Sequence, residues 1–137
     1  MRAALAEASK ASDKQEVPVG AVVVYNNMII ARAHNLTETL KDPTAHAEMQ
    51  AITAATNYLG GKYLTDCTIY ATLEPCAMCA GAIGWSQASV LVYGAKDEKK
   101  GFGTISGILL HPKTKIVSGI MEEECRDLLL SFFKRKR

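Results

Sequence analysis

The chain has 137 residues, 48% of them hydrophobic and 22% charged, which excludes disordered and collagen-like proteins and predicts one domain over residues 1–137. Sixteen basic and fourteen acidic residues give a formal net charge of +2, too small to indicate a nucleic-acid binder without local basic patches. No run reaches the roughly 18 apolar residues of a membrane helix and no signal-peptide core is present, so we expect a cytoplasmic protein that does not enter membranes.

The first part of the chain predicts a helix followed by a β-hairpin. Residues 1–15 form a weak amphipathic pattern of alanines and charges, and residues 16–25 form a continuous β-branched run. Asn26 and Asn27 tolerate left-handed backbone angles. We therefore expect a hairpin over residues 17–35.

A second helix is predicted over residues 41–59. Asp42 is its expected cap, and Pro43 suits the first turn because its φ angle is already close to the helical value. The double glycine that follows residue 59 is expected to end the helix.

The second half of the chain continues the alternation of strands and helices. The predicted strands cover residues 67–73, 89–95 and 115–120, and the predicted helices cover residues 76–87 and 121–136. The intervening residues 96–115 are rich in glycine and lysine and predict loops with a short helical piece. This alternation favours a layered α/β domain around one central sheet.

The motif PCAMC contains a pair of cysteines with ligand spacing. Cys76 and Cys79 are three residues apart, so they share one face of the predicted helix, and Cys76 lies in the first turn, where unpaired N–H groups stabilise a thiolate. Without a secretory signal, such a pair indicates metal binding or redox chemistry before a disulfide. No thioredoxin-like surround is evident, which favours zinc, while the redox alternative stays open.

The motif HAE offers a third ligand and a proton carrier. His46 and two thiolates would form a three-ligand zinc site whose fourth position is open to water, as in catalytic zinc sites. Glu48, two residues later, can lie beside that water rather than on the metal. Zinc lowers the pKa of bound water towards about 7, and a carboxylate within reach can carry its proton to a leaving nitrogen.

Each of these residues alone would be unremarkable, because a single histidine or glutamate on a helix is more often a structural or solvated residue. The combination of H-x-E with a later P-C-x-x-C is far more specific and is the signature of zinc nucleobase deaminases. A zinc metalloprotease is excluded, because its H-E-x-x-H motif needs a second histidine where this chain has Gln50.

Four segments, EVPVGAVVV, DPTAHAEMQAI, YATLEPCAMCAGAI and VYGAKDEKKG, extend this match. With them the chain resembles the bacterial tRNA-specific adenosine deaminases of the cytidine deaminase-like superfamily. The resemblance covers nearly the whole chain and is weakest in the loop after Gly101.

The resemblance implies an activity and its machinery. His46, Cys76 and Cys79 would hold one Zn²⁺ ion per subunit, and Glu48 would move protons. Water would be the co-substrate: hydroxide would attack C6 of the wobble adenosine in a tRNA anticodon stem-loop, releasing ammonia and leaving inosine. The implied fold is a three-layer α/β/α arrangement with a central mixed five-stranded sheet, zinc between the N-terminal ends of two helices, and a homodimeric assembly.

The resemblance also implies substrate-binding residues. Asn35 would hydrogen-bond the purine, Val19 and Ala47 would line the base pocket, and Asp97 would lie near the nucleotide backbone. Without the resemblance, Asn35 would be interpreted as part of a turn at the end of a strand. Val19 and Ala47 would be interpreted as core residues, and Asp97 as a solvated charge. Phe133, in the basic terminal segment SFFKRKR, would stack on a splayed base or else pack in the core.

Two alternative functions remain open at this stage. A free-base or nucleoside deaminase, acting on guanine, cytosine or cytidine, shares both motifs. A non-enzymatic zinc module that binds RNA or protein would need neither Glu48 nor an open coordination position.

Several further residues have no role in this hypothesis. Cys67 and Cys125 are predicted to be buried, reduced thiols. His34, His111 and the loop of residues 101–113 are left unassigned.

Overall fold

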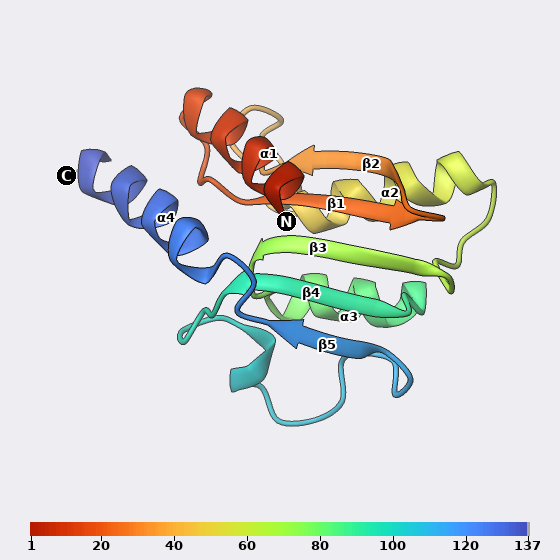
Figure 1. The fold of residues 1–137 in the computed structure, drawn as a ribbon. Helices are drawn as coiled ribbons and strands as arrows, with labels where there is room; N and C mark the ends of the chain where they lie inside the picture. Colours follow the sequence, from red (N-terminus) through yellow and green to blue (C-terminus); the bar gives the residue numbers. More distant parts are fainter. Residues whose placement is uncertain (137) are drawn as a thin grey trace.

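The structure is a computed structural model, and it describes residues 1–136 (Figure 1). Its elements in chain order are α1 (Arg2–Asp13), β1 (Gly20–Tyr25), β2 (Met28–His34), α2 (Ala47–Leu59), β3 (Cys67–Leu73), α3 (Ala77–Ser86), β4 (Val90–Ala95), the short 3₁₀ helix η1 (Phe102–Thr104), β5 (Lys115–Ser118) and α4 (Glu122–Lys136). None of the helices within residues 1–136 is long and apolar enough to cross a membrane.

The five strands form one mixed sheet in the order β2-β1-β3-β4-β5. The β2-β1-β3 pairs are antiparallel, whereas β3-β4 and β4-β5 are parallel. Helices α1 and α4 cover one face of this sheet, and α2 and α3 cover the other (Figure 1). The predicted three-layer α/β/α fold with a mixed five-stranded sheet is confirmed.

The main core lies between the sheet and the α2–α3 layer. Val23, Ile69 and Leu91 are opposite one another on β1, β3 and β4, and none has any exposed surface. Ala51 and Ala55 of α2 are equally buried, and their small side chains let the helix approach the strands closely. Each large aliphatic side chain buried here contributes roughly 1.5–3 kcal/mol. This packing fixes the position of α2, and hence of the residues at its N-terminal end.

Two glycines allow the helices of the opposite layer to lie directly on the strands. A Cβ atom on Gly20 would overlap the carbonyl oxygen of Ala4 in α1, and one on Gly94 would overlap the Cys125 sulfur of α4. Cys125, which packs against Gly94, is a buried free thiol, and so is Cys67 on β3. The prediction for these two cysteines is confirmed.

The predicted hairpin is also confirmed, but its first strand is shorter than the β-branched run. Asn26 and Asn27 have φ angles of 50° and 59°, the left-handed conformation that a tight turn requires. Strand β1 begins at Gly20 and not at residue 16. Pro18 has no N–H to donate to a ladder, and the Val19 N–H is already bonded to the Val17 carbonyl in a tight turn.

The predicted start of the second helix is wrong. Helix α2 begins at Ala47, six residues after the expected start at 41. The carboxylate of Asp42 accepts hydrogen bonds from the N–H and hydroxyl of Thr44, at 2.8 and 2.7 Å, and so caps a local turn instead of the helix. His46 is the residue that stands at the N-cap, in an extended conformation with φ −70° and ψ 155°.

Candidate active site

Three potential metal ligands converge at the N-terminal ends of two helices. His46 is the N-cap of α2, Cys76 is the N-cap of α3, and Cys79 projects from the first turn of α3. The Nδ1 atom of His46 lies 3.6 Å from the sulfur of Cys76 and 3.4 Å from that of Cys79. All three donor atoms lie within 4.8 Å of one another.

The spacing of these donor atoms fits a tetrahedral zinc ion. Zn–S bonds of about 2.3 Å and Zn–N bonds of about 2.0–2.1 Å, at tetrahedral angles, place nitrogen and sulfur about 3.5–3.6 Å apart. The observed separations of 3.6 and 3.4 Å agree with this value. An imidazole with two thiolates is a donor set that favours zinc, and with three ligands one position stays open.

The protonation of the two sulfurs is coupled. Hydrogen bonds from the Cys79 thiol and from His46 lower the pKa of Cys76 to about 3, so this sulfur is a thiolate at neutral pH. The hydrogen bond to Cys76, reinforced by burial, raises the pKa of the Cys79 thiol, and the hydrogen bond with Cys76 raises the pKa of His46. A cation bound here would displace the remaining protons.

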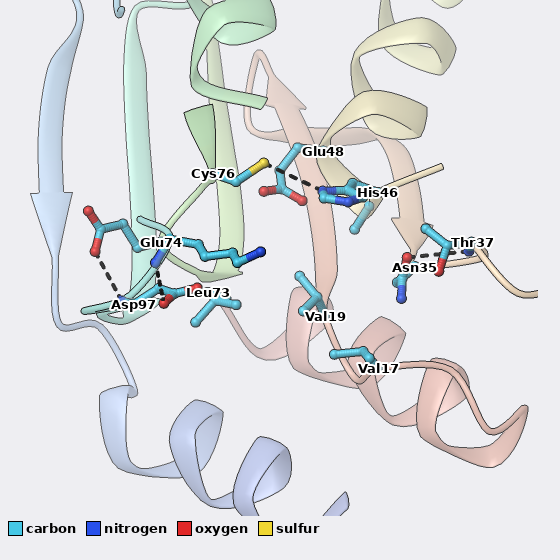
Figure 2. Close-up of a pocket in the computed structure, with 12 residues that line it drawn as sticks. Val17, Val19, Asn35, Thr37, His46, Glu48, Leu73, Glu74, Cys76 and Asp97 are labelled. Atoms are coloured by element: carbon cyan, nitrogen blue, oxygen red, sulfur yellow. Dashed lines mark hydrogen bonds between the residues drawn. The ribbon is translucent and has the colours of Figure 1, made fainter. Parts of the chain in front are cut away.

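Glu48 lies in the first turn of α2, and its side chain is 4% exposed. Figure 2 shows its carboxyl group beside Cys76 and His46, on the inner side of the cavity. Burial raises the pKa of Glu48, which brings the carboxyl group closer to the range in which it exchanges protons at neutral pH. The arrangement places a buried carboxyl group next to the three potential metal ligands.

A cavity of about 250 Å³ opens in front of these groups (Figure 2). Val19, Asn35, Ala47 and Asp97 line it together with His46, Glu48 and Cys76. The structure therefore brings four of the five predicted substrate-binding residues to the predicted metal ligands. The volume lies just below the roughly 300–1,000 Å³ of drug-sized pockets, so it suits a single base better than a whole nucleotide.

Phe133, the fifth predicted substrate-binding residue, lies outside this cavity. It projects from α4 with 48% of its side chain exposed, next to Phe132, which is 4% exposed. Phe133 lines a neighbouring hollow with Lys96, Lys99 and Arg126, and this hollow shares Val17, Leu73 and Asp97 with the cavity. Of the two aromatics in the terminal segment, one packs in the core and the other faces solvent at the rim. Arg137 at the chain end lies outside the described residues.

Glu74 is a residue at the site that the sequence did not single out. Its carboxylate is 3% exposed and accepts hydrogen bonds from the N–H groups of Asp97, at 3.0 Å, and Gly103, at 2.8 Å. Gly101 lies so close that an added Cβ would overlap this carboxylate. Glu74 thus ties the loop after β4, which supplies Asp97 and Lys100 to the cavity, to the segment that leads into α3.

Glu16 fixes the loop on the other side of the cavity through hydrogen bonds to its backbone, as Glu74 does for the loop after β4. It has no exposed surface, and it accepts hydrogen bonds from the N–H groups of Glu38, at 3.1 Å, and Thr39, at 2.6 Å, and from the Thr39 hydroxyl, at 2.6 Å. Burial alone would raise the pKa of Glu16, but these hydrogen bonds outweigh it and lower the pKa. The loop that Glu16 holds carries Thr37 to the cavity wall.

Comparisons with known proteins agree with this site. The family model for MafB19-like deaminases matches residues 1–137. The tRNA-specific adenosine deaminase of Bacillus subtilis (strain 168) is 48% identical over 142 residues, which cover 100% of this chain and 88% of the relative. The tRNA-specific adenosine deaminase of Aquifex aeolicus is 44% identical, covering 100% of this chain and 93% of the relative.

A solved structure from a study of A-to-I editing by tRNA:A34 deaminases superimposes with a TM-score of 0.87 and 40% identity, covering 94% of this chain and 97% of that one. The sequence and structural matches both run along nearly the full chain. The chain therefore belongs to the family of tRNA-specific adenosine deaminases.

Proposed function

We propose that this protein is a zinc-dependent hydrolase that converts adenosine to inosine at the wobble position of a tRNA anticodon loop, and that residues 1–137 act as one catalytic domain. The observation that carries the proposal is the convergence of His46, Cys76 and Cys79 beside the buried Glu48 at the base of a cavity sized for one base. The full-length similarity to tRNA-specific adenosine deaminases supports the choice of substrate.

The proposed chemistry exchanges one nitrogen for one oxygen. One zinc ion per subunit, held by His46, Cys76 and Cys79, would supply a water molecule of lowered pKa. Glu48 would take a proton from the attacking water as the water oxygen bonds to C6 of adenine and would pass this proton to N1, and it would then carry the remaining hydroxyl proton to the exocyclic nitrogen. The C6–N bond breaks, ammonia leaves and the base becomes hypoxanthine.

We further propose that Asn35, Val19 and Ala47 hold the base. The Asn35 side chain is 7% exposed, and its amide offers both a donor and an acceptor to a purine edge. Val19 gives an apolar wall, and Ala47 is small enough to leave room for a flat ring beside the ligands. A base from an anticodon loop can enter such a pocket at lower cost than one paired in a duplex.

The hollow next to the cavity is our proposed contact for the rest of the loop RNA. Lys96, Lys99 and Arg126 lie there beside the exposed ring of Phe133, together with Glu98 and Glu122. The three basic side chains suit phosphates, and the ring suits an unstacked base. Asp97 stands between this hollow and the cavity, where the ribose of the wobble nucleotide would pass. Because tRNA is the proposed substrate, we also propose that the protein acts in the cytoplasm.

The test of the proposed function compares substrates of different classes. Purified protein is incubated with a tRNA anticodon stem-loop bearing adenosine at the wobble position, and separately with guanine, cytosine and cytidine. We expect ammonia release only with the RNA, and none with the same stem-loop carrying guanosine at that position. The guanine deaminase of Nitrosomonas europaea shares the fold, with a TM-score of 0.80 and 22% identity, covering 94% of this chain and 80% of that one. Guanine is therefore the free base to test first. Ammonia release from guanine alone would refute the proposal.

We also propose that the protein is a homodimer that associates through α3. Trp85 on α3 and Ile108 in the following loop are each 85% exposed, and they flank a hollow lined by Gly81, Leu109 and His111. Exposed aromatic and aliphatic side chains around a hollow are typical of a protein interface. A partner here would lie close to the helix that carries two of the proposed zinc ligands.

Changing both Trp85 and Ile108 to Glu should weaken dimerisation by at least about 30-fold, because a buried interface tryptophan commonly contributes 2 kcal/mol or more. Analytical ultracentrifugation across a concentration series measures the change. Tyr58→Glu is the matched control, since Tyr58 is 58% exposed but lies outside this hollow. A double variant that dimerises as tightly as the wild type would place the interface elsewhere.

A further inference from the structure

Gln50 links the two halves of the site through its side-chain amide. It lies on α2, one turn after His46, and its Nε2 atom donates hydrogen bonds to the carbonyl oxygens of His34, at 2.8 Å, and Ala45, at 3.0 Å. Each of these carbonyls belongs to the residue just before a site residue, Asn35 in one case and His46 in the other. One amide therefore joins the end of β2 to the segment that leads into α2.

Asn35 is held on both sides by this arrangement. The carbonyl of the preceding His34 accepts from Gln50, and the N–H of the following Leu36 donates to the Ala45 carbonyl, at 3.1 Å, which is the second acceptor of Gln50. In contrast, the hydrogen bond from the Thr37 N–H to the Asn35 side-chain oxygen is long, at 3.4 Å. The N–H of Asn35 itself donates to the Val19 carbonyl, at 3.0 Å. Backbone hydrogen bonds of Asn35 and its neighbours, including the one from Gln50, therefore fix the position of Asn35 more than its side chain does.

His34 is in turn held by side chains of α1 and its C-cap, so the carbonyl that accepts from Gln50 belongs to a residue whose position is fixed. The Nδ1 atom of His34 lies 2.9 Å from a Glu7 carboxylate oxygen, and its Nε2 atom lies 3.1 Å from the Lys14 ammonium. Because an ammonium group can only donate, Nε2 must accept, and the ring proton must be on Nδ1, facing Glu7. Lys10 donates to the other oxygen of Glu7, at 2.7 Å, which completes the anchor.

We propose that Gln50 is a positioning residue that sets the separation between the base-binding amide of Asn35 and the metal ligand His46. This inference rests on the proposed function, in which Asn35 holds the base and His46 holds the ion that supplies the attacking water. Attack on C6 requires the base and the water to be aligned closely, and a displacement of 1 Å can cost about 100-fold in rate. Gln50 makes no contact with either reactant in this scheme, and it acts through the backbone on each side.

The experiment replaces Gln50 with Met, which has a similar length and shape but cannot donate. We expect kcat on the anticodon stem-loop to fall by about tenfold, and KM to rise only by the factor by which binding of the wobble base is weakened, because the phosphate contacts lie elsewhere. Zinc content should remain that of the wild type. Thr53→Val is the matched control and should match the wild type, since the exposed Thr53 hydroxyl bonds only to the Met49 carbonyl within α2.

A binding measurement separates positioning from general damage. The wild type should bind the stem-loop with its wobble base present more tightly than the same RNA with an abasic wobble position, and Gln50→Met should reduce that preference without changing the affinity for the abasic RNA. If the Met variant does not fold, Gln50→Glu keeps the shape but sets a carboxylate against two carbonyls, and its kcat should fall further.

The outcomes distinguish this inference from the proposed function. An active wild type with a fully active Gln50→Met variant would overturn the inference alone. A wild type that leaves the RNA unchanged would overturn the proposed function and this inference with it.

Discussion

Replacing Glu48 with Gln should reduce turnover of the RNA substrate by about 10²–10⁴-fold, the range expected when a positioned proton carrier is lost. Glutamine has nearly the same shape, so the buried site, in which Glu48 is 4% exposed, should keep its packing. It cannot take a proton from water or return one to the leaving nitrogen. Zinc content and melting temperature should therefore stay close to those of the wild type while kcat collapses.

Glu48→Ala should have the same catalytic effect, and agreement between the two variants would exclude a packing artefact. Glu123→Gln is the control, because it removes one negative charge from an exposed position at the start of α4, outside the cavity. Ammonia release and zinc analysis are measured on the same samples. Wild-type turnover in Glu48→Gln would rule out Glu48 as the proton carrier.

Replacing Cys79 with Ala should abolish both zinc retention and activity. Cys79 has no exposed surface, and its sulfur lies 3.4 Å from His46 Nδ1, so its loss leaves only two protein ligands. Zinc affinity should fall by more than the roughly 10–100-fold that loss of an outer partner of a ligand costs. The melting temperature should also fall, because an ion that binds only the folded state stabilises it.

Zinc per chain after dialysis against a chelator, measured together with thermal unfolding, tests this second prediction. Cys67→Ala is the matched control, since Cys67 is also a buried free thiol but lies on β3, outside the ligand trio. It should retain wild-type zinc content. Equal zinc retention by the Cys79 variant and the wild type would mean that the metal is held elsewhere.

The convergence of His46, Cys76 and Cys79 could be predicted from the sequence because each of the two motifs that supply them is local. Cys76 and Cys79 are three residues apart at the start of α3, and His46 precedes Glu48 by two residues at the start of α2. The signature of H-x-E with a later P-C-x-x-C connected the two motifs, which lie 30 residues apart. The placement of Asn35 and Asp97 at the cavity was available only through the resemblance to a known family.

The boundaries of elements were harder to predict, because competing local structures decide them. Asp42 and Pro43 together match the usual pattern of a helix start. In the structure, however, Asp42 accepts a hydrogen bond from Thr44 in a separate turn, and the helix begins only at Ala47. The β-branched run from residue 16 predicted a longer strand than the ladder allows, since Pro18 cannot donate to it.

Glu16, Glu74 and Gln50, which hold the loops and strand ends around the cavity but belong to no sequence motif, were not predicted to have a role at the site. Glu16 and Glu74 accept hydrogen bonds from backbone N–H groups 22–29 positions away in the chain, and Gln50 donates to a carbonyl 16 positions away. A side chain that hydrogen-bonds to a backbone group far away in the chain produces no periodic pattern and no characteristic residue spacing in the sequence. Only the fold, which brings the β2 end and the loop after β4 to the same cavity, reveals these partners.

The most direct measurement of the central claim is the location of inosine in an arginine tRNA bearing adenosine at the wobble position, after incubation with the purified protein. Reverse transcription reads inosine as guanosine, so the site of change can be assigned to a single nucleotide. We predict conversion at the wobble adenosine and at no other adenosine of the tRNA. An unchanged wobble adenosine, with ammonia released from guanine, cytosine or cytidine instead, would contradict the proposal.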